Sequence, residues 1–133
     1  MRLWTIVLGA AASVAIASGA LAQERERSTL SHPAGANTVV LNGAPSPATG
    51  RALYFYDKDE TGVSKCVGQC TAAWPPLTPA PDAQPSGAWT IITRADGARQ
   101  WAYNGRPVYV FYRDKPDALA TGAQLIPGWR LAK

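Results

Sequence analysis

GRALYFYDKDETGVSKCVGQCTAAWPPL, residues 50–77, contains both cysteines of the chain and its densest set of aromatic side chains. The pattern of this stretch returns 55 positions later. The matched pairs are Gly50 and Gly105, Arg51 and Arg106, Tyr54 and Tyr109, Tyr56 and Phe111, Asp59 and Asp114, and Trp74 and Trp129. Several of these residue types are rare, so six matches in one register indicate an internal duplication. A duplicated unit of this kind usually needs its second copy to bury its apolar face.

The second half of the chain carries the clearer strand pattern. Residues 89–94, 99–103 and 108–112 are β-prone, and Asp96-Gly97 and Asn104-Gly105 separate them. These dipeptides favour the positive φ angles of tight hairpin turns. We therefore predict a three-stranded antiparallel meander.

The first half predicts shorter elements. Residues 38–41 are expected to open a strand, and residues 42–50, rich in Pro, Gly and Ser, are expected to form a loop. Cys70 to Trp74 is expected to make one helical turn that Pro75 ends, because a proline disfavours helical geometry at the residue before it.

Residues 52–56 predict a further strand, in which Tyr54 and Tyr56 share one face while Leu53 and Phe55 share the other. No segment has an apolar period of 3.6 residues long enough for a substantial helix. The predicted fold class is mainly all-β. We expect a small antiparallel β domain of two pseudo-symmetric repeats, with at most one or two short helical turns.

The beginning of the chain predicts export. Met1-Arg2 is a short basic start, an apolar run rich in Ala and Val follows, and Ala20-Leu21-Ala22 is a typical cleavage motif. We expect cleavage near Ala22, no retained membrane span, and a periplasmic or secreted product. The expected organisation is a signal peptide over 1–22, a flexible N-terminal arm over 23–37, and a single β domain over 38–133 with repeat 1 at about 38–77, a linker at 78–87 and repeat 2 at about 88–133.

The charge balance argues against nucleic acid as a partner. Without residues 1–22, which contain Arg2, twelve Lys and Arg face nine Asp and Glu. This excess is small and scattered along the chain, whereas binding to a phosphate backbone needs a clustered basic face.

With these residues in view, the chain resembles the secreted-repeat family of bacterial envelope proteins, also described as predicted lipoproteins with a Tyr-x-(Phe/Trp/Tyr)-x-x-Asp motif. The motif occurs twice, from Tyr54 to Asp59 and from Tyr109 to Asp114. The resemblance also covers Cys66-x3-Cys70, Trp74-Pro75-Pro76, Arg94-x-Asp96-Gly97 and Tyr103-Asn104-Gly105, in the family's order. It implies a secreted protein without an established activity. This chain lacks the cysteine to which a lipid anchor would be attached.

The two cysteines predict one local disulfide between Cys66 and Cys70, because they stand four positions apart in an exported chain. The alternative is thiol–disulfide exchange by the same pair. Exchangers usually carry Cys-x-x-Cys at a helix N-terminus in a βαβ context, which this sequence lacks.

No metal site and no cofactor are predicted. Outside residues 1–22 the chain has one His, no Met and two Cys that are expected to be oxidised. Residues 57–62 imitate the first half of a calcium-binding EF-hand loop, but position twelve of that loop would be Gly68 instead of the bidentate Glu. A solvated turn in which Asp59 accepts backbone N–H bonds is the favoured interpretation.

The repeated aromatic and acidic residues allow two interpretations. As structure, the rings form the core and each Asp ties its strand to the following loop. As function, the two aromatic faces line a groove for a sugar, a tetrapyrrole or peptide side chains. The constant spacing in both copies favours the core. Trp101 and Tyr112 have no counterpart at the offset of 55, so we expect them to be contact residues outside the core.

Nothing in the sequence assembles a nucleophile, a base and an orienting group, and the only histidine, His32, lies in the predicted arm. An acid pair of Asp59 and Asp114 would require that both point into one cleft. We expect a non-catalytic binding or cell-envelope interaction module, whose partner is an unknown envelope protein or small ligand; the alternative is a redox protein that uses Cys66 and Cys70.

Overall fold

The computed structural model describes residues 27–133, with only the backbone of residues 124 and 125. The predicted signal peptide lies outside the described residues, as do the first four residues of the predicted arm. The elements in chain order are β1 (Thr38–Leu41), β2 (Ala44–Pro47), β3 (Tyr54–Tyr56), α2 (Cys70–Ala73), β4 (Trp89–Thr93), β5 (Arg99–Tyr103), β6 (Arg106–Pro107), α3 (Gly122–Leu125) and β7 (Trp129–Leu131).

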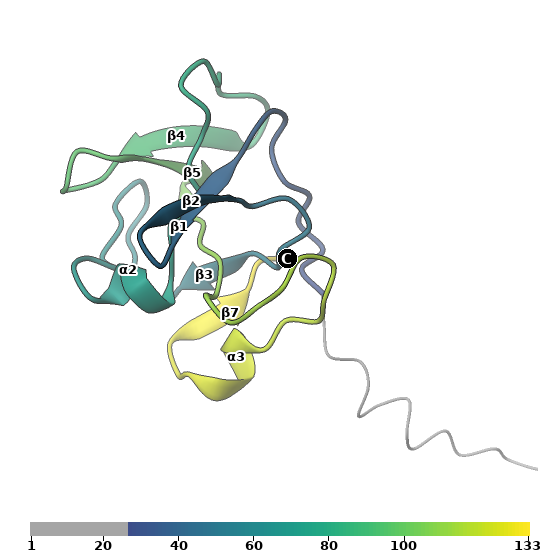
Figure 1. Ribbon diagram of the computed structural model, residues 1–133. Helices are drawn as coiled ribbons and strands as arrows, with labels where there is room; N and C mark the ends of the chain where they lie inside the picture. The colour runs from purple at the N-terminus through teal and green to yellow at the C-terminus, as the bar shows by residue number, and fades with distance from the viewer. Residues whose placement is uncertain (1–26) are drawn as a thin grey trace, which may run out of the picture.

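The strands form three small antiparallel sheets, β1–β2, β3–β7 and β4–β5–β6. Figure 1 shows β4 and β5 at one end of the molecule, β3, β7 and α3 at the other, and the β1–β2 hairpin between them. Helices α2 and α3 have four residues each. The mainly all-β prediction of two repeats is confirmed, as is the helical turn that begins at Cys70.

Tight turns fix the hairpins where the sequence supplies residues that tolerate positive φ. Asn104 and Gly105 have φ angles of 48° and 79° and join β5 to β6. Asn42 and Gly43, at 51° and 78°, join β1 to β2. Both pairs fit the two-residue turn whose twist matches that of antiparallel strands.

The prediction for residues 42–50 was wrong, because Ala44–Pro47 is β2 and pairs with β1 from Leu41↔Ala44 to Thr38↔Pro47. Two prolines in four residues are unusual in a strand. They are tolerated here because an edge strand pairs on one side only.

The meander is present, but its third strand is shorter and earlier than predicted. β6 covers Arg106–Pro107, just before the predicted strand at 108–112; Val108 still donates to the Trp101 carbonyl at 3.0 Å, and the chain then leaves β5. Tyr109 instead makes antiparallel bridges to Tyr54 and to Pro76. Tyr109 therefore pairs with residues of the first copy instead of with β5 of its own copy.

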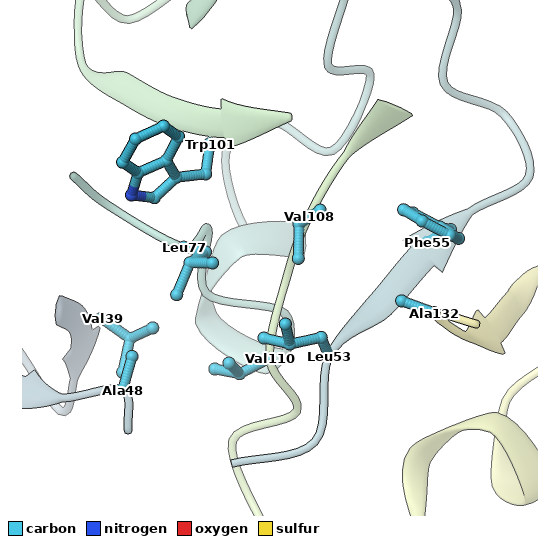
Figure 2. Close-up of a cluster of buried hydrophobic side chains, with 9 residues drawn as sticks. All are labelled: Val39, Ala48, Leu53, Phe55, Leu77, Trp101, Val108, Val110 and Ala132. Atoms are coloured by element: carbon cyan, nitrogen blue, oxygen red, sulfur yellow. The ribbon is translucent and has the colours of Figure 1, made fainter. Parts of the chain in front are cut away.

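The two extended segments around Tyr54 and Tyr109 separate two hydrophobic clusters. Leu53 and Phe55 of the first segment, and Val108 and Val110 of the second, belong to one cluster (Figure 2). The second cluster contains Tyr54, Trp74, Tyr109, Phe111 and Trp129, with Tyr56 packed against it. The alternation predicted for residues 53–56 is therefore confirmed, and each strand contributes to two cores because successive side chains point to opposite faces.

The described part of the predicted flexible arm, residues 27–37, is attached to the domain. Ser28 Oγ donates to the carbonyl of Ala132 at 2.7 Å, and His32 Nε2 lies 2.9 Å from the carbonyl oxygen of Arg51. Asn37 is buried and its amide donates to the carbonyl of Pro33 at 2.8 Å. The polar composition suggested mobility, but Ser28 and His32 bond to main-chain oxygens of the folded domain, and Asn37 Oδ1 accepts from the Trp101 indole. Within the described residues, no helix is long and apolar enough to cross a membrane.

Candidate functional site

The two copies of the repeat meet at Tyr54 and Tyr109. The amide of Tyr54 donates to the carbonyl of Tyr109 at 2.9 Å, and the amide of Tyr109 donates to the carbonyl of Tyr54 at 3.0 Å. Equivalent residues thus pair with each other, which is the arrangement expected at a pseudo-two-fold axis.

Each tyrosine hydroxyl reaches across to the aspartate of the other copy. Tyr109 donates to Asp59 Oδ2 at 2.7 Å, and Tyr54 donates to Asp114 Oδ2. The hydroxyl of Tyr109 also lies 2.6 Å from Ser64 Oγ, and that of Tyr54 accepts from the Gly122 amide at 3.1 Å. The sequence predicted the repeat but not this exchange of partners.

The second oxygen of each carboxylate holds the loop that follows it, as predicted. Asp59 Oδ1 accepts from the Lys65 amide at 2.6 Å, and Asp114 Oδ1 accepts from the Thr121 amide at 3.1 Å and its hydroxyl at 2.6 Å. Each carboxylate is therefore engaged by its own loop and by one tyrosine.

Burial sets the protonation of these groups. It raises the pKa of Tyr54 and of Tyr109 well above the ordinary tyrosine value, and the neighbouring carboxylate adds to the effect. Burial also raises the pKa of Asp59, although hydrogen bonds from the Lys65 amide and the Tyr109 hydroxyl oppose that rise. The tyrosines are thus fixed as neutral hydrogen-bond donors.

The repeated aromatic rings form the second core. Trp74 stacks on Trp129 with centroids 3.8 Å apart and planes 4° from parallel, and Trp129 stacks on Tyr56 at 4.3 Å. Trp74 also contacts Phe111 at 4.7 Å, the counterpart of the Trp129–Tyr56 contact. All except Tyr56 are buried. The rings pack against one another, so the core interpretation is confirmed; Tyr56, together with Asp59, also lines a cavity of about 450 Å³.

Of the two predicted contact residues, one is corrected. Trp101 is 1% exposed, lies in the first core, and donates from its indole nitrogen to Asn37 Oδ1 at 2.6 Å. Its partner Asn37 lies in the predicted arm, outside both repeats. Tyr112 is 42% exposed, and its contact role stays a prediction.

Cys66 and Cys70 form the predicted disulfide, with an S–S distance of 2.02 Å. Cys66 is fully buried beside Trp74, and Cys70 is the first residue of α2. The bridge therefore closes the loop that precedes the helical turn. Redox activity of this pair stays a hypothesis.

A groove of about 360 Å³ lies between the β1–β2 hairpin, α2, the segment that follows α2, and the turn between β4 and β5. We call it the β1/α2 groove. Its walls include Val40, Thr71, Pro76, Thr78, Arg94 and Arg99. Its volume falls within the range of small-molecule and peptide-side-chain sites.

Arg94 is the most unusual residue of this groove, because its guanidinium is almost entirely buried. Nη1 donates to Ser64 Oγ at 2.8 Å and to Gln100 Oε1 at 2.7 Å, and Nη2 donates to the Cys66 carbonyl at 2.6 Å. These three partners are neutral. Nε has no hydrogen-bond partner, and its nearest acidic atom is Asp96 Oδ2 at 3.6 Å, an ion-pair distance too long for a hydrogen bond.

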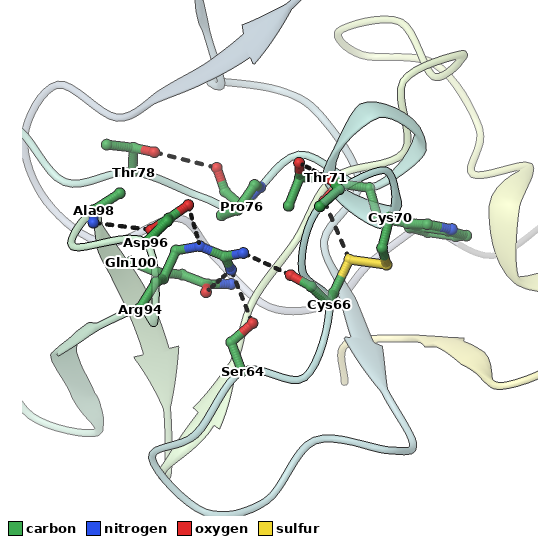
Figure 3. Close-up of polar contacts among 12 residues, drawn as sticks. Ser64, Cys66, Cys70, Thr71, Pro76, Thr78, Arg94, Asp96, Ala98 and Gln100 are labelled. Carbon is green, nitrogen blue, oxygen red and sulfur yellow. Dashed lines mark hydrogen bonds and ion pairs between the residues drawn. A yellow bond between two sulfur atoms is a disulfide. The ribbon is translucent and has the colours of Figure 1, made fainter.

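Figure 3 shows how the guanidinium is oriented. Nη1 and Nη2 point toward Ser64 and Cys66, whereas Nε faces Asp96, on the side where Thr78, Pro76 and Thr71 lie. The Nε–H is therefore directed toward Asp96 at the groove wall, and the nitrogen itself is buried. Since Ser64 also contacts the Tyr109 hydroxyl, this wall of the groove is joined to the repeat motif.

The outer edge of β1 forms the opposite wall. Val40 stands opposite Pro45, which has no N–H and cannot donate across the hairpin. This is therefore a pair without hydrogen bonds between its members, and the N–H and C=O of Val40 point away from β2. The N–H and C=O of Thr38 also point away from β2. The Thr38 amide donates to the Thr78 carbonyl at 3.0 Å, and the Thr78 amide donates to the Thr38 carbonyl at 2.8 Å. One step further the partner would be Pro76, which cannot donate. Pro76 thus lacks the donor for the next pair of bonds, and within the described residues the ladder between these two segments ends at Thr38.

The groove residues were not among the predicted site residues. Arg94 was noticed only as part of a turn, although a lone arginine at the end of an apolar strand is a signal that sequence analysis could have used. Within residues 27–133, no three His, Cys, Asp or Glu side chains are grouped as metal ligands would be. In residues 57–62, which resemble the start of an EF-hand loop, the carboxylate of Asp59 accepts hydrogen bonds from the Lys65 amide and the Tyr109 hydroxyl.

Comparison with known proteins identifies the family. A family model described as "secreted repeat of unknown function" matches residues 47–78 and 90–129, together just over half of the chain. The two matched regions contain the two copies of the Tyr and Asp motif. No curated protein and no solved structure is similar enough to the chain to count as a match. The two matched repeats and the paired contacts that join them show that the chain belongs to the family of secreted repeats of unknown function.

Proposed function

We propose that this protein is an exported binding module of the cell envelope and that the β1/α2 groove is its ligand site. The observation that carries the proposal is the buried guanidinium of Arg94 in the groove wall, whose Nε lacks a hydrogen bond and faces the exposed Asp96 at 3.6 Å. A buried charged group without its hydrogen bond is costly, and in native proteins such groups are rare and often functional.

Binding, not catalysis, is the role that the carboxylates support. Asp59 and Asp114 each accept bonds from their own loop and from one tyrosine, so their oxygens are used in holding the two copies together. The same repeat makes a rigid frame around the groove, because Arg94 is fixed through Ser64 and Gln100. A preformed site loses little conformational entropy on binding.

An NMR titration of the protein with acetate, N-methylacetamide, methylammonium and glucose tests this proposal. We expect at least one probe to shift the backbone amides of Val40, Thr71, Thr78 and Ala98, all of which line the groove. Ala72→Gln, which fills the groove from α2, is expected to abolish these shifts. Ala118→Gln, at an exposed alanine outside the groove, is the matched control. If no probe shifts the groove amides, the groove is not the ligand site.

A further inference from the structure

We propose that the β1/α2 groove receives the free carboxylate end of an extended peptide, an inference that rests on the proposed function and names its ligand class. The last residue of the peptide pairs with the free edge of β1 at Val40. Its carboxylate accepts a hydrogen bond from Arg94 Nε.

The first element of the argument is the main-chain edge. Val40 directs one N–H and one C=O away from β2, and its side chain is 55% exposed. Within residues 27–133, no hydrogen bond links these two groups to a segment other than the hairpin. An unpaired strand edge of this kind accepts another extended segment by the same bonds that Thr38 makes with Thr78.

The second element is charge. The ionised side chains that line the groove are Arg94, Arg99 and Asp96, two positive and one negative. Arg94 is held in place by neutral acceptors, and its charge is offset in part by Asp96, 3.6 Å from Nε, and by Asp59, which does not line the groove. An anionic group is therefore favoured, and a carboxylate provides the planar oxygen acceptors that a guanidinium binds best.

The third element is the exposure of Asp96. Its side chain is 60% exposed, and its Oδ1 accepts from the Ala98 amide at 2.9 Å while Oδ2 stays 3.6 Å from Nε. Asp96 thus offsets part of the charge of Arg94 but accepts no hydrogen bond from its Nε. Nε itself is buried and faces Asp96, so a ligand carboxylate reaches it by taking the place of the Asp96 carboxylate, whose exposed side chain turns away into solvent.

The unpaired edge of β1 and the guanidinium of Arg94 lie on opposite walls of one groove. The last residue of a peptide carries both a main-chain N–H for the edge and a carboxylate for the guanidinium. An internal acidic residue also carries a carboxylate, but its main chain continues in both directions. Both sources share the same anion chemistry, so the experiment must separate them.

The test uses an N-acetylated Thr-Val-Thr-Val peptide with a free carboxylate, its C-terminal amide, and an amidated peptide with an internal Asp. Binding to the full protein is measured by calorimetry and by NMR shifts of the groove amides. We expect the free carboxylate to bind and the amide to bind roughly tenfold or more weakly, since the charge-assisted bond is lost. Equal binding of acid and amide overturns the inference, and so does equal or tighter binding of the internal-Asp peptide.

Two pairs of variants test the individual contacts. Val40→Pro and Val40→Ala both remove the valine side chain, but only proline removes the N–H, so we expect about fivefold weaker binding for proline than for alanine. Because Val40 faces Pro45, the loss breaks no bond of the β1–β2 ladder. Asp96→Asn keeps the acceptor for Ala98 and removes the competing charge, so carboxylate binding should strengthen about two- to fivefold. Equal affinities within the Val40 pair contradict the edge contact.

Failure of this inference is separate from failure of the proposed function. If acetate, N-methylacetamide, methylammonium or glucose shifts the groove amides but none of the three peptides binds, the groove remains a ligand site and its assignment to peptide ends is wrong.

Discussion

Replacing Tyr54 with phenylalanine is the most direct test of how the two copies are joined. The substitution keeps the ring but removes a hydroxyl that donates to Asp114 and accepts from the Gly122 amide at 3.1 Å. Tyr54 is fully buried and Asp114 is 4% exposed, so water cannot replace the lost partner. A hydrogen bond to a charged group contributes about 1.5 to 3 kcal/mol, and a buried group left unpaired costs a similar amount. We expect the free energy of unfolding to fall by about 3 kcal/mol.

The equivalent substitution in the second copy provides an internal comparison. Tyr109→Phe removes the bond to Asp59, whose side chain is partly exposed, so water compensates part of the loss. It also removes the contact with Ser64, whose hydroxyl keeps its bond from Arg94. We expect a decrease of about 2 kcal/mol. Tyr112→Phe is the control, because Tyr112 is 42% exposed and should change stability by less than about 0.5 kcal/mol.

Urea unfolding followed by both tryptophan fluorescence and circular dichroism measures these changes, provided that the two transitions coincide. The double variant Tyr54→Phe with Asp114→Asn should lose less than the sum of the two single losses, because the residues are in contact. If Tyr54→Phe costs no more than Tyr112→Phe, or if the double variant is strictly additive, the exchanged Tyr–Asp bonds do not hold the copies together.

Three further predictions follow from the same core. Gly122→Ala would place a methyl carbon 2.5 Å from the Trp74 ring, so we expect a loss of about 2 to 3 kcal/mol in the urea assay; an unchanged midpoint contradicts the tight contact. Replacing both Cys66 and Cys70 with alanine should lower the free energy of unfolding by about 2 kcal/mol, as a five-residue loop implies, and a loss within error of zero refutes this estimate. The two buried tyrosines have raised pKa values in the folded state, so the unfolded chain loses its tyrosine protons first, and the stability present below about pH 10 should fall as the pH rises above it. Urea midpoints on either side of pH 10 measure this fall, and Tyr54→Phe should make it shallower.

Local sequence signals predicted the parts of the fold that near neighbours control. Asn104-Gly105 closes a hairpin because these residues tolerate positive φ, and alternating side chains in residues 53–56 point to opposite faces. The same rule could have found the β1–β2 hairpin from Asn42-Gly43. The prolines of Ala44–Pro47 obscured it, because proline is rare in strands other than edge strands.

The sequence by itself determined that the chain contains two copies of one aromatic and acidic motif, that the fold is mainly β, and that its two cysteines are close enough to bridge. Only the tertiary structure decided that each tyrosine bonds to the aspartate of the other copy, that Trp101 is buried against Asn37, and that the buried Arg94 in the groove wall has a nitrogen without a hydrogen bond. Composition, spacing and turn chemistry act between near neighbours along the chain. The partners of Tyr54, Trp101 and Arg94 depend on which distant strand edges pair, and that choice is made by burial of the whole chain.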